Sequence, residues 1–317
     1  MDEKGHIIAI IADVDYTLTP HFMQKPLFEH FNHDFQQFWD ESKEEHRYLG
    51  KILSSEKDFP KELQTPMFQL RAEACYEITY ADLIIDHIKK GCPRTGKKWE
   101  GLNRLLLRKL GSKIKFFEGL PEAIREEKEF VKNHPKWKKF NIKLEWYAIS
   151  LGIADMIRGS AIGPYLDGVF AYEFAPAKED HPTKGIINKV ATPMLFAGKP
   201  QYLYQLNKGP LVDVNEKMAQ EIRRIPFQNM LYLGDGQSDV PAFAVIKRNL
   251  GRNIAVYSPY EARCYIESVK LYSQKRVDHI AIANYQRGSI LRKIIRQWIT
   301  EVAERIVAEE LNTKQDL

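Results

Sequence analysis

The stretch from His6 to Thr19 reads HIIAIIADVDYTLT, and it carries the clearest structural signal in the chain. Its first half is apolar and rich in isoleucine, a composition typical of a strand buried on both faces of a parallel sheet. The apolar run ends at Asp13, and Asp15 follows two residues later. Two carboxylates at the end of such a strand can act as a nucleophile and as a general acid or base.

Strands and helices alternate in the second half of the chain. Apolar segments indicate the strands, and the segments between them show helical periodicity. The expected strands are residues 142–149, 169–174, 229–233, 253–257 and 279–283. The expected helices are residues 152–160, 185–191, 213–224, 239–247 and 260–271, with a closing amphipathic helix at 289–311. This alternation predicts a parallel sheet with helices on both faces.

The segment between the first two strands has a different pattern. Helical patterns lie near residues 26–43, 61–90, 99–110 and 121–133, and prolines separate several of them. We therefore expect an α/β fold with a Rossmann-like core of residues 1–20 and 140–317 and an inserted helical cap domain of residues 21–139. Residues 193–210 fit neither a helical nor a strand period, so we expect a loop or hairpin insertion there.

Composition narrows the class of protein. The 317 residues are 44% hydrophobic and 28% charged, which is typical of a soluble globular protein. The sequence shows no secretory leader and no apolar run of membrane-spanning length, so we expect a cytoplasmic protein that does not associate with a membrane. Cys75, Cys92 and Cys264 are far apart without Cys-x-x-Cys spacing, and the nine histidines form no metal-binding pattern. We therefore expect neither a disulfide framework nor a zinc site.

Charge is unevenly distributed along the chain. The net charge is +5, but residues 89–139 hold 16 Lys and Arg against 6 Asp and Glu, an excess of +10, so the remainder carries −5. In the expected fold this basic segment lies in or next to the cap, where it would attract a phosphorylated substrate. A solvated helix face is the alternative explanation.

Polar residues follow three of the expected strands. Ser150 comes directly after the strand at 142–149, and GDGQSD from Gly234 to Asp239 follows the strand at 229–233. Because the carboxyl ends of parallel strands meet at one edge of a sheet, we expect these groups near Asp13. Carboxylates are the ligands that Mg²⁺ prefers. Lys184 begins an expected helix and would neutralise phosphoryl charge, with Lys189 as its rival.

These segments, in this order, resemble the four motifs of the haloacid dehalogenase (HAD) superfamily of phosphatases. The resemblance covers residues 1–20 and about 140–285. It implies a Mg²⁺-dependent phosphohydrolase that cleaves a phosphate monoester through an aspartyl-phosphate intermediate. Asp13 would be the nucleophile and a metal ligand. Asp15 would be the general acid and then the general base, and its backbone carbonyl would touch the metal. Lys184 would bridge the nucleophile and the phosphate.

The resemblance also implies roles for the remaining matched residues. Thr17, Ser150 and Gly236 would serve substrate binding, Thr17 by supporting the loop and Ser150 by holding a phosphoryl oxygen. Asp235 would bind Mg²⁺, and Asp239 would bind it or order its surroundings. Four of these residues have a plainer explanation: Thr17 could cap the next segment, Ser150 and Asp239 could cap helices, and Gly236 could only permit a turn with positive φ.

Two positions depart from the pattern. Ser238 stands where many relatives have Asn. Phe22 stands where the phosphoserine phosphatase branch, the nearest in motif style, carries a Glu that grips the substrate amine. The expected substrate is therefore a small phosphorylated molecule other than phosphoserine.

Two other functions remain open from the sequence. The basic segment could steer a nucleotide or a polynucleotide end, although nucleic acid is not the favoured partner. A non-catalytic binding protein on the same fold is the second, but all four carboxylates of the motifs are present, which favours an enzyme. Nothing in the sequence indicates the oligomeric state.

Overall fold

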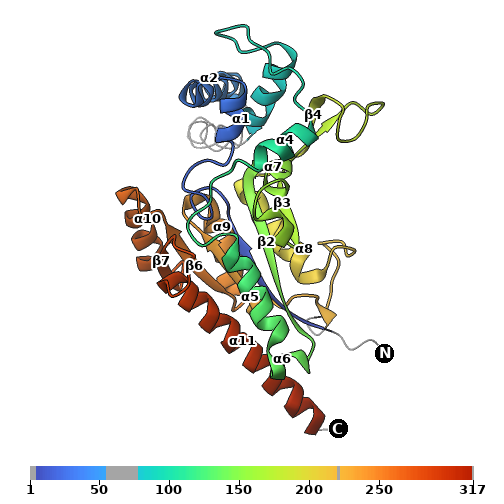
Figure 1. The fold of residues 1–317 in the computed structure, drawn as a ribbon, viewed down its shortest axis with the longest axis vertical. Helices are drawn as coiled ribbons and strands as arrows, with labels where there is room; N and C mark the ends of the chain where they lie inside the picture. Colours follow the sequence, from blue (N-terminus) through green and yellow to red (C-terminus); the bar gives the residue numbers. More distant parts are fainter. Residues whose placement is uncertain (1–4, 55–77, 220–221, 316–317) are drawn as a thin grey trace.

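The computed structural model describes residues 5–54, 78–219 and 222–315. Its centre is a seven-stranded sheet in the order β4-β3-β2-β1-β5-β6-β7 (Figure 1). All neighbouring strands pair in parallel except β3 and β4, which are antiparallel. The strands are β1 (His6–Ala12), β2 (Ile142–Ile153), β3 (Gly168–Pro176), β4 (Ile187–Thr192), β5 (Met230–Gly234), β6 (Arg252–Tyr257) and β7 (His279–Ile282). The α/β class and the mostly parallel sheet confirm the prediction.

Strand β1 lies in the middle of the sheet because it can be buried on both faces. It pairs with β2 on one side and β5 on the other. From Ile8 to Ala12 every side chain is fully buried. At about 25 cal/mol per Å² of buried apolar surface, such a strand belongs at the core rather than at an edge. Its central place puts the residues that follow it between the ends of two other strands.

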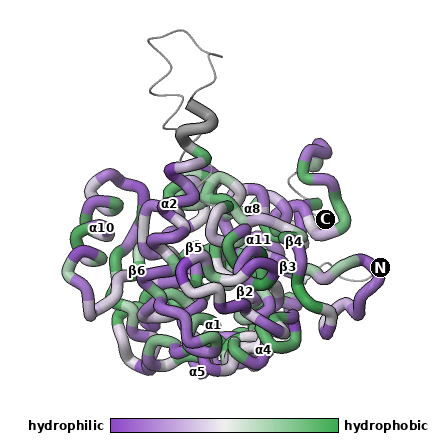
Figure 2. Tube along the Cα trace, turned by 90° about the horizontal axis from the view of Figure 1, so that it is seen from above, coloured by the Kyte–Doolittle hydropathy of each residue, from purple (hydrophilic) through white to green (hydrophobic). Residues whose placement is uncertain are grey.

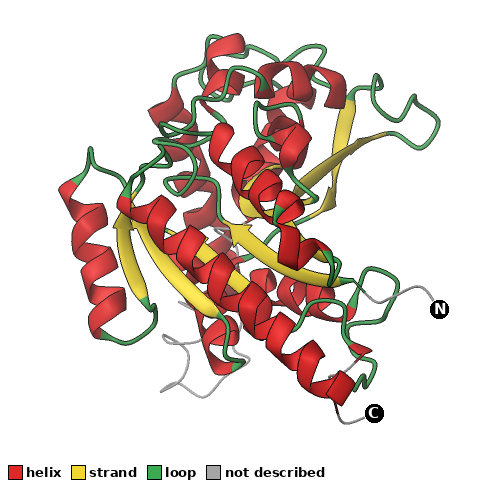
Figure 3. Ribbon diagram, turned by 60° about the horizontal axis from the view of Figure 1, so that its bottom comes forward, coloured by secondary structure: helices red, strands yellow, loops and turns green. Residues whose placement is uncertain are grey.

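Helices cover both faces of the sheet (Figures 1 and 3). On one face α11 crosses the sheet beside α5, and Glu127 of α5 forms ion pairs with Arg292 and Arg296 of α11. On the other face α8 packs against α9. Helix α10 lies along β6 and β7, and Figures 1 and 2 show it on the opposite side of the molecule from β4. These helices are α5 (Glu122–Asn133), α6 (Pro135–Lys138), α8 (Lys199–Lys208), α9 (Val240–Arg248), α10 (Ala262–Ser273) and α11 (Ile290–Gln315).

A group of helices between β1 and α5 lies beyond the carboxyl ends of the strands (Figure 1). We call it the inserted block; it consists of α1 (Lys25–His30), α2 (Phe35–Ser54), a helix of residues 78–89, and α4 (Arg104–Gly111). Helix α4 packs against α7 (Ala154–Arg158), which follows β2. The part of the expected 61–90 helix before residue 78 falls outside the described residues.

The extent of the cap domain stays a prediction, and the packing of α5 bears on it. Helix α5 contacts β2, and α6 contacts α11, so both belong to the layer that covers the sheet. They fall inside the range 21–139 expected for the cap. We therefore propose that the cap ends before α5.

Three local predictions were wrong. The helix expected at 185–191 is the strand β4, which pairs antiparallel with β3 and contains the β-branched Ile187, Val190 and Thr192. The loop expected at 193–210 contains helix α8, which starts at Lys199 with Pro200 in its first turn. The described part of 213–224 forms turns instead of a helix, and the amide of Asn215 bonds to the Asp213 carboxylate in a local turn.

Within the described residues, every helix is too short or too polar to cross a lipid bilayer.

Candidate active site

Three strands bring the polar groups to one edge of the sheet. Asp13 directly follows β1, Asp235 directly follows β5, and Ser150 lies near the end of β2. The register pairs Ala12 with both Ala148 and Leu233, so the three positions are nearly level. The amide of Asp13 donates a hydrogen bond to the Leu233 carbonyl at 2.9 Å, which continues the pairing one residue beyond the strand. The structure therefore brings these segments together at one edge of the sheet, as the sequence predicts.

The loop after Asp13 is held in a tight turn. The amides of Leu18 and Thr19 both donate to the Val14 carbonyl, at 2.8 and 3.0 Å. Tyr16 has a φ of 58°, in the left-handed region that non-glycine residues rarely occupy. The side chain of Thr17 is fully buried, and its carbonyl accepts a hydrogen bond from the Tyr285 hydroxyl. Thr17 is thus placed to support the loop.

Asp15 points back toward the start of the inserted block. Its Oδ1 atom accepts a hydrogen bond from the Met23 amide at 2.6 Å. Burial, together with the nearby charge of Asp13, raises the pKa of Asp15 to about 8. At neutral pH the carboxyl group then holds a proton that it can donate.

Lys199, which no sequence motif indicates, lies at the centre of the site. Lys199 Nζ is 3.1 Å from Asp13 Oδ1 and 2.7 Å from Asp239 Oδ1, and the side chain is completely buried. Burial alone would lower the pKa of Lys199, but the two carboxylates outweigh it and raise the pKa. Lys199 therefore remains a cation inside the protein.

The prediction that Lys184 lies beside Asp13 was wrong. Lys184 is exposed on the loop before β4, and its rival Lys189 is exposed within β4. The sequence does not single out Lys199, because residues 193–210 fit neither a helical nor a strand period clearly. The available signal was Pro200 followed by the apolar pair Leu203 and Leu206, a pattern that indicates the start of a helix and its buried face.

Both carboxylate oxygens of Asp239 are already bound by the protein. Oδ1 contacts Lys199 and accepts a hydrogen bond from the Tyr232 hydroxyl at 2.8 Å. Oδ2 accepts one from the Asp235 amide at 3.2 Å. A Cβ atom at Gly234 would overlap Oδ2, so this approach requires glycine. Of the two roles expected for Asp239, these contacts favour ordering Lys199 and Asp235 over direct metal binding, and its side chain makes no helix-capping bond.

The carboxylates of Asp13, Asp235 and Asp239 form a cluster, called here the carboxylate cluster, whose ligand atoms all lie within 4.8 Å of one another. Burial and the charge of Asp239 raise the pKa of Asp13 to about 7 against the opposing effect of Lys199. Burial and the two neighbouring carboxylates raise the pKa of Asp235 well above its usual value. A divalent cation would relieve this repulsion, and oxygen ligands suit Mg²⁺.

The structure does not support the plainer explanations for Ser150 and Gly236, which were a helix cap and a turn with positive φ. Ser150 lies inside β2 and caps no helix; its Oγ accepts a hydrogen bond from the Gly152 amide at 2.9 Å, which leaves its hydroxyl proton to donate. Gly236 has a φ of −167°, so it is not needed for a positive φ. A Cβ there would meet nothing within 4 Å, which leaves open space beside the site.

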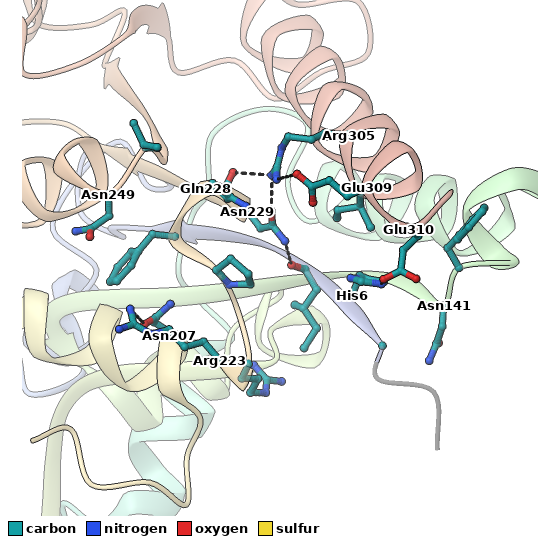
Figure 4. Close-up of a pocket in the computed structure, with 18 of the residues that line it drawn as sticks. His6, Asn141, Asn207, Arg223, Gln228, Asn229, Asn249, Arg305, Glu309 and Glu310 are labelled. Carbon is teal, nitrogen blue, oxygen red and sulfur yellow. Dashed lines mark hydrogen bonds and ion pairs between the residues drawn. The ribbon is translucent and has the colours of Figure 1, made fainter. Parts of the chain in front are cut away.

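A groove of about 760 Å³ lies at the opposite edge of the sheet, next to the start of β1 (Figure 4). Figure 4 shows Arg305 bonded to Glu309 and Asn229, and His6 beside Glu310. Arg305 and His6 thus have acidic partners within the groove. Because the groove is separated from Asp13 by the length of β1, it has no part in the chemistry of the carboxylate cluster.

Several side chains of the basic segment 89–139 form internal ion pairs. Arg104 and Arg108 both bind Asp155, and Lys128 binds Asp167. Lys136 pairs with Glu304 of α11. These four cations fix helices to the core and are not free for a polyanion, which weakens the case for a nucleic-acid partner.

No family model matches the chain. A protein of Borreliella burgdorferi described as uncharacterized is 30% identical over 318 residues, which cover 95% of this chain and 98% of that protein. The two chains therefore belong to one family.

The chain is also similar to solved structures. A phospho-aspartyl intermediate analogue of phosphoserine phosphatase has a TM-score of 0.45 at 15% identity, covering 92% of this chain and 99% of that one. A substrate-bound phosphoserine phosphatase has a TM-score of 0.42 at 16% identity, covering 92% and 97%. A HAD family hydrolase from Salmonella enterica serovar Typhi has a TM-score of 0.43 at 14% identity, covering 88% and 68%. Since these TM-scores are below 0.5, the function is inferred from the residues of this chain.

Proposed function

We propose that this chain is a member of the haloacid dehalogenase superfamily and a Mg²⁺-dependent phosphohydrolase, in which the phosphoryl group passes through an acyl phosphate on Asp13. The observation that carries the proposal is the contact of a fully buried Lys199 with Asp13 at 3.1 Å and with Asp239 at 2.7 Å. A buried lysine between two carboxylates at the ends of neighbouring strands costs desolvation energy that a purely structural core would avoid. The cost is understandable at a site that must receive a dianionic phosphoryl group.

Lys199, Asp13 and Asp15 each have a separate role in the reaction. Lys199 holds Oδ1 of Asp13, so the other oxygen, Oδ2, is the one to attack phosphorus. As the bond from phosphorus to the leaving oxygen breaks, Asp15 gives that oxygen its proton and the alcohol departs. Asp15 then takes a proton from water, which attacks phosphorus, releases inorganic phosphate and restores Asp13.

The remaining polar groups bind and neutralise the phosphoryl group. Lys199 opposes its negative charge, and the Ser150 hydroxyl can donate to one of its oxygens. Asp13 and Asp235, with the backbone carbonyl of Asp15, would hold Mg²⁺, while Asp239 orders Lys199 and Asp235. The bound ion would add positive charge against the phosphoryl oxygens.

The side of the site toward the inserted block is aromatic. Phe22 lies 5.2 Å from Tyr16 and 5.3 Å from Trp39 between ring centroids, and 5.6 Å from Phe35. Phe22 is close to Asp15, because the Asp15 carboxylate accepts a hydrogen bond from the amide of Met23, the residue after Phe22. These rings offer no charge to a substrate amine, so we propose a small phosphate monoester with an apolar or aromatic leaving group in place of phosphoserine.

Phosphate release tests the proposal. The native chain and Asp13→Asn are compared on p-nitrophenyl phosphate, phosphoserine, sugar phosphates and nucleotides, with Mg²⁺ and with a chelator. We expect release that requires Mg²⁺, disappears in Asp13→Asn, and is faster with p-nitrophenyl phosphate than with phosphoserine. Release that is unchanged in Asp13→Asn would overturn the mechanism, and a native chain that binds Mg²⁺ but hydrolyses none of the panel would favour the binding-protein alternative.

A further inference from the structure

Four side chains of metal-binding type meet inside the inserted block, far from one another in sequence. They are His33, Glu41, His87 and Cys92, and we call them the His–Cys cluster. Each offers one ligand atom, and these atoms all lie within 4.8 Å of one another. His33 lies between α1 and α2, Glu41 belongs to α2, and His87 belongs to the helix of residues 78–89, with Cys92 just after it.

His87 presents an unprotonated ring nitrogen to the cluster. Its Nδ1 atom lies 2.8 Å from the Leu83 carbonyl, a contact that requires a proton on Nδ1. In the neutral ring Nε2 then carries a lone pair, and this atom is 3.2 Å from Glu41 Oε2. Two lone pairs at that distance repel each other unless a cation or a proton lies between them. The same arrangement, with one ring nitrogen donating to a carbonyl, orients histidines that bind metals.

Three buried polar atoms in the cluster have no hydrogen-bond partner in the part of the chain that the structure describes. His87 is fully buried and Glu41 is 5% exposed. The Nε2 atoms of His33 and His87 and the Oε2 atom of Glu41 are inaccessible to solvent and make no hydrogen bond. Each such group costs free energy when it is left unsatisfied. A single cation at the centre would satisfy all three atoms together.

Cys92 is fixed in position by its own turn. Its amide donates to the Lys97 carbonyl, and its carbonyl accepts from the Gly96 amide. Gly91 has a φ of 94°, and a Cβ there would overlap the Gly96 carbonyl, so the turn requires glycine. Gln37 Nε2 donates both to Cys92 Sγ at 3.4 Å and to Glu41 Oε1 at 2.8 Å. The thiol and the carboxylate are thereby oriented toward the same point.

Aromatic rings enclose the cluster and exclude water. Trp99 and Phe38 are buried, and their ring centroids lie 5.0 and 5.4 Å from that of His87. The ring of His33 packs against that of His87, with 4.9 Å between their centroids. Among the described residues, the cationic side chain paired with Glu41 is Arg94, which is half exposed at the rim with its Nε 4.0 Å from Oε1. Arg94 therefore does not fill the centre.

We propose that His33, Glu41, His87 and Cys92 bind one Zn²⁺ ion in the inserted block, apart from the magnesium site. Two neutral imidazoles, one thiolate and one carboxylate carry a charge of −2 and match the nitrogen, sulfur and oxygen ligands of tetrahedral zinc. Four protein ligands leave no open position, which is the pattern of a structural site. The proposal departs from the sequence-based expectation of no zinc site, because these ligands come from two separate segments without a short spacing.

The bound ion would fix the inserted block over the active site. It would join α2 to the helix of residues 78–89. That second helix carries Tyr80, whose hydroxyl donates to the Leu151 carbonyl next to Ser150. Trp39, from α2, packs against Tyr80 at 5.8 Å between ring centroids. Zinc therefore holds the part of the block that faces the phosphoryl site.

Metal content tests the proposal on the full chain. Each protein is incubated with ZnSO₄, freed of loose metal by gel filtration in the presence of Mg²⁺, and analysed by mass spectrometry of the elements. We expect about one zinc per chain for the native protein and for the controls Cys264→Ser and Asp13→Asn. We expect at least a tenfold loss for Cys92→Ser and for His87→Gln. Because Asp13→Asn retains zinc, failure of the zinc site and failure of the phosphatase proposal are distinguishable.

Cobalt substitution of the native chain removes any dependence on how the variants fold. Co²⁺ in a tetrahedral site with a thiolate ligand gives visible absorption and a thiolate-to-metal charge-transfer band. We expect both bands at one equivalent of Co²⁺ and their loss on addition of Zn²⁺. A native chain without the charge-transfer band and without stoichiometric zinc would overturn the proposal and identify the cluster as a buried ion pair of His87 and Glu41.

Discussion

The carboxylate cluster and the His–Cys cluster differ in how far the protein itself supplies partners for their buried polar atoms. In the carboxylate cluster Lys199 is a built-in cation, and Asp239 has every oxygen engaged by Lys199, Tyr232 or the Asp235 amide. In the His–Cys cluster the Nε2 atoms of His33 and His87 and the Oε2 atom of Glu41 make no hydrogen bond within the described residues. The Cys92 thiol contacts only Gln37 Nε2 and Glu41 Oε1 there, at 3.4 and 3.5 Å. A site that is partly balanced without its metal can leave positions open for a substrate. A site whose atoms are unsatisfied requires its cation in order to be stable.

The largest difference between the clusters should appear when the built-in cation is removed. Lys199→Met leaves Asp13 and Asp239 buried without their partner, and the phosphoryl charge without its counter-ion. We expect kcat to fall by about 10²- to 10³-fold. Steady-state kinetics on p-nitrophenyl phosphate measures this, with circular dichroism to verify folding.

The matched control for that variant is Lys184→Met. Lys184 is exposed and distant from Asp13 in the fold, so we expect its kcat to stay within about twofold of the native value. A large loss of kcat in Lys184→Met with a nearly normal Lys199→Met would reverse the assignment of the cation.

Chelators should separate the two metals. EDTA followed by gel filtration and addition of Mg²⁺ alone should restore activity only while zinc is retained in the His–Cys cluster. Complete removal of zinc should lower Tm by at least about 4 °C, because loss of a tightly bound ligand removes a few kcal/mol of stability. Differential scanning calorimetry with metal analysis of the same samples checks this. Equal Tm values with and without zinc would mean that the ion does not stabilise the block.

A smaller effect is expected at the aromatic side of the active site. Phe22→Ala removes a ring that contacts Tyr16, Phe35 and Trp39. We expect kcat/KM for p-nitrophenyl phosphate to fall about fivefold, since one ring contact contributes about 1 kcal/mol beyond its buried area. The value for phosphoserine should change less. Equal losses for both substrates would indicate that Phe22 only supports the fold.

The smallest effect concerns one of several bonds to Asp239. Tyr232→Phe removes the hydroxyl that donates to Oδ1 at 2.8 Å but leaves Lys199 and the Asp235 amide in place. We expect a loss of about 1 kcal/mol in the free energy of unfolding, measured with urea, and less than a tenfold loss of kcat. A loss as large as that of Lys199→Met would show that Tyr232 holds Asp239 more firmly than the ion pair does.

The two clusters also differ in how far the sequence predicts them. Asp13, Asp15, Asp235 and Ser150 could be placed because each follows an apolar strand, and parallel strands end at a common edge. Lys199 could not, because its partner residues are 186 and 40 positions away in the chain and the segment around it shows weak periodicity. The helix start at Pro200 was the one local signal for it.

The His–Cys cluster had no comparable signal. His87 on a helix and Cys92 after it look like ordinary packed residues, and His33 and Glu41 lie more than 40 residues earlier in the chain. Only the packing of α2 against the helix of residues 78–89 brings them together. Similarly, the sequence of β4 does not distinguish a strand from a helix, because six residues at the edge of a sheet show neither the helical nor the strand period clearly.

The most direct test of the central claim is to trap the phosphorylated aspartate. The native chain is mixed with substrate and Mg²⁺, quenched, treated with borohydride, and digested for mass spectrometry. Borohydride reduces an aspartyl phosphate to homoserine and leaves a free aspartate unchanged. The account predicts homoserine at position 13 only, and none in Asp13→Asn. Steady turnover of substrate with no reduction at position 13, or with reduction at Asp15 or Asp235, would contradict it.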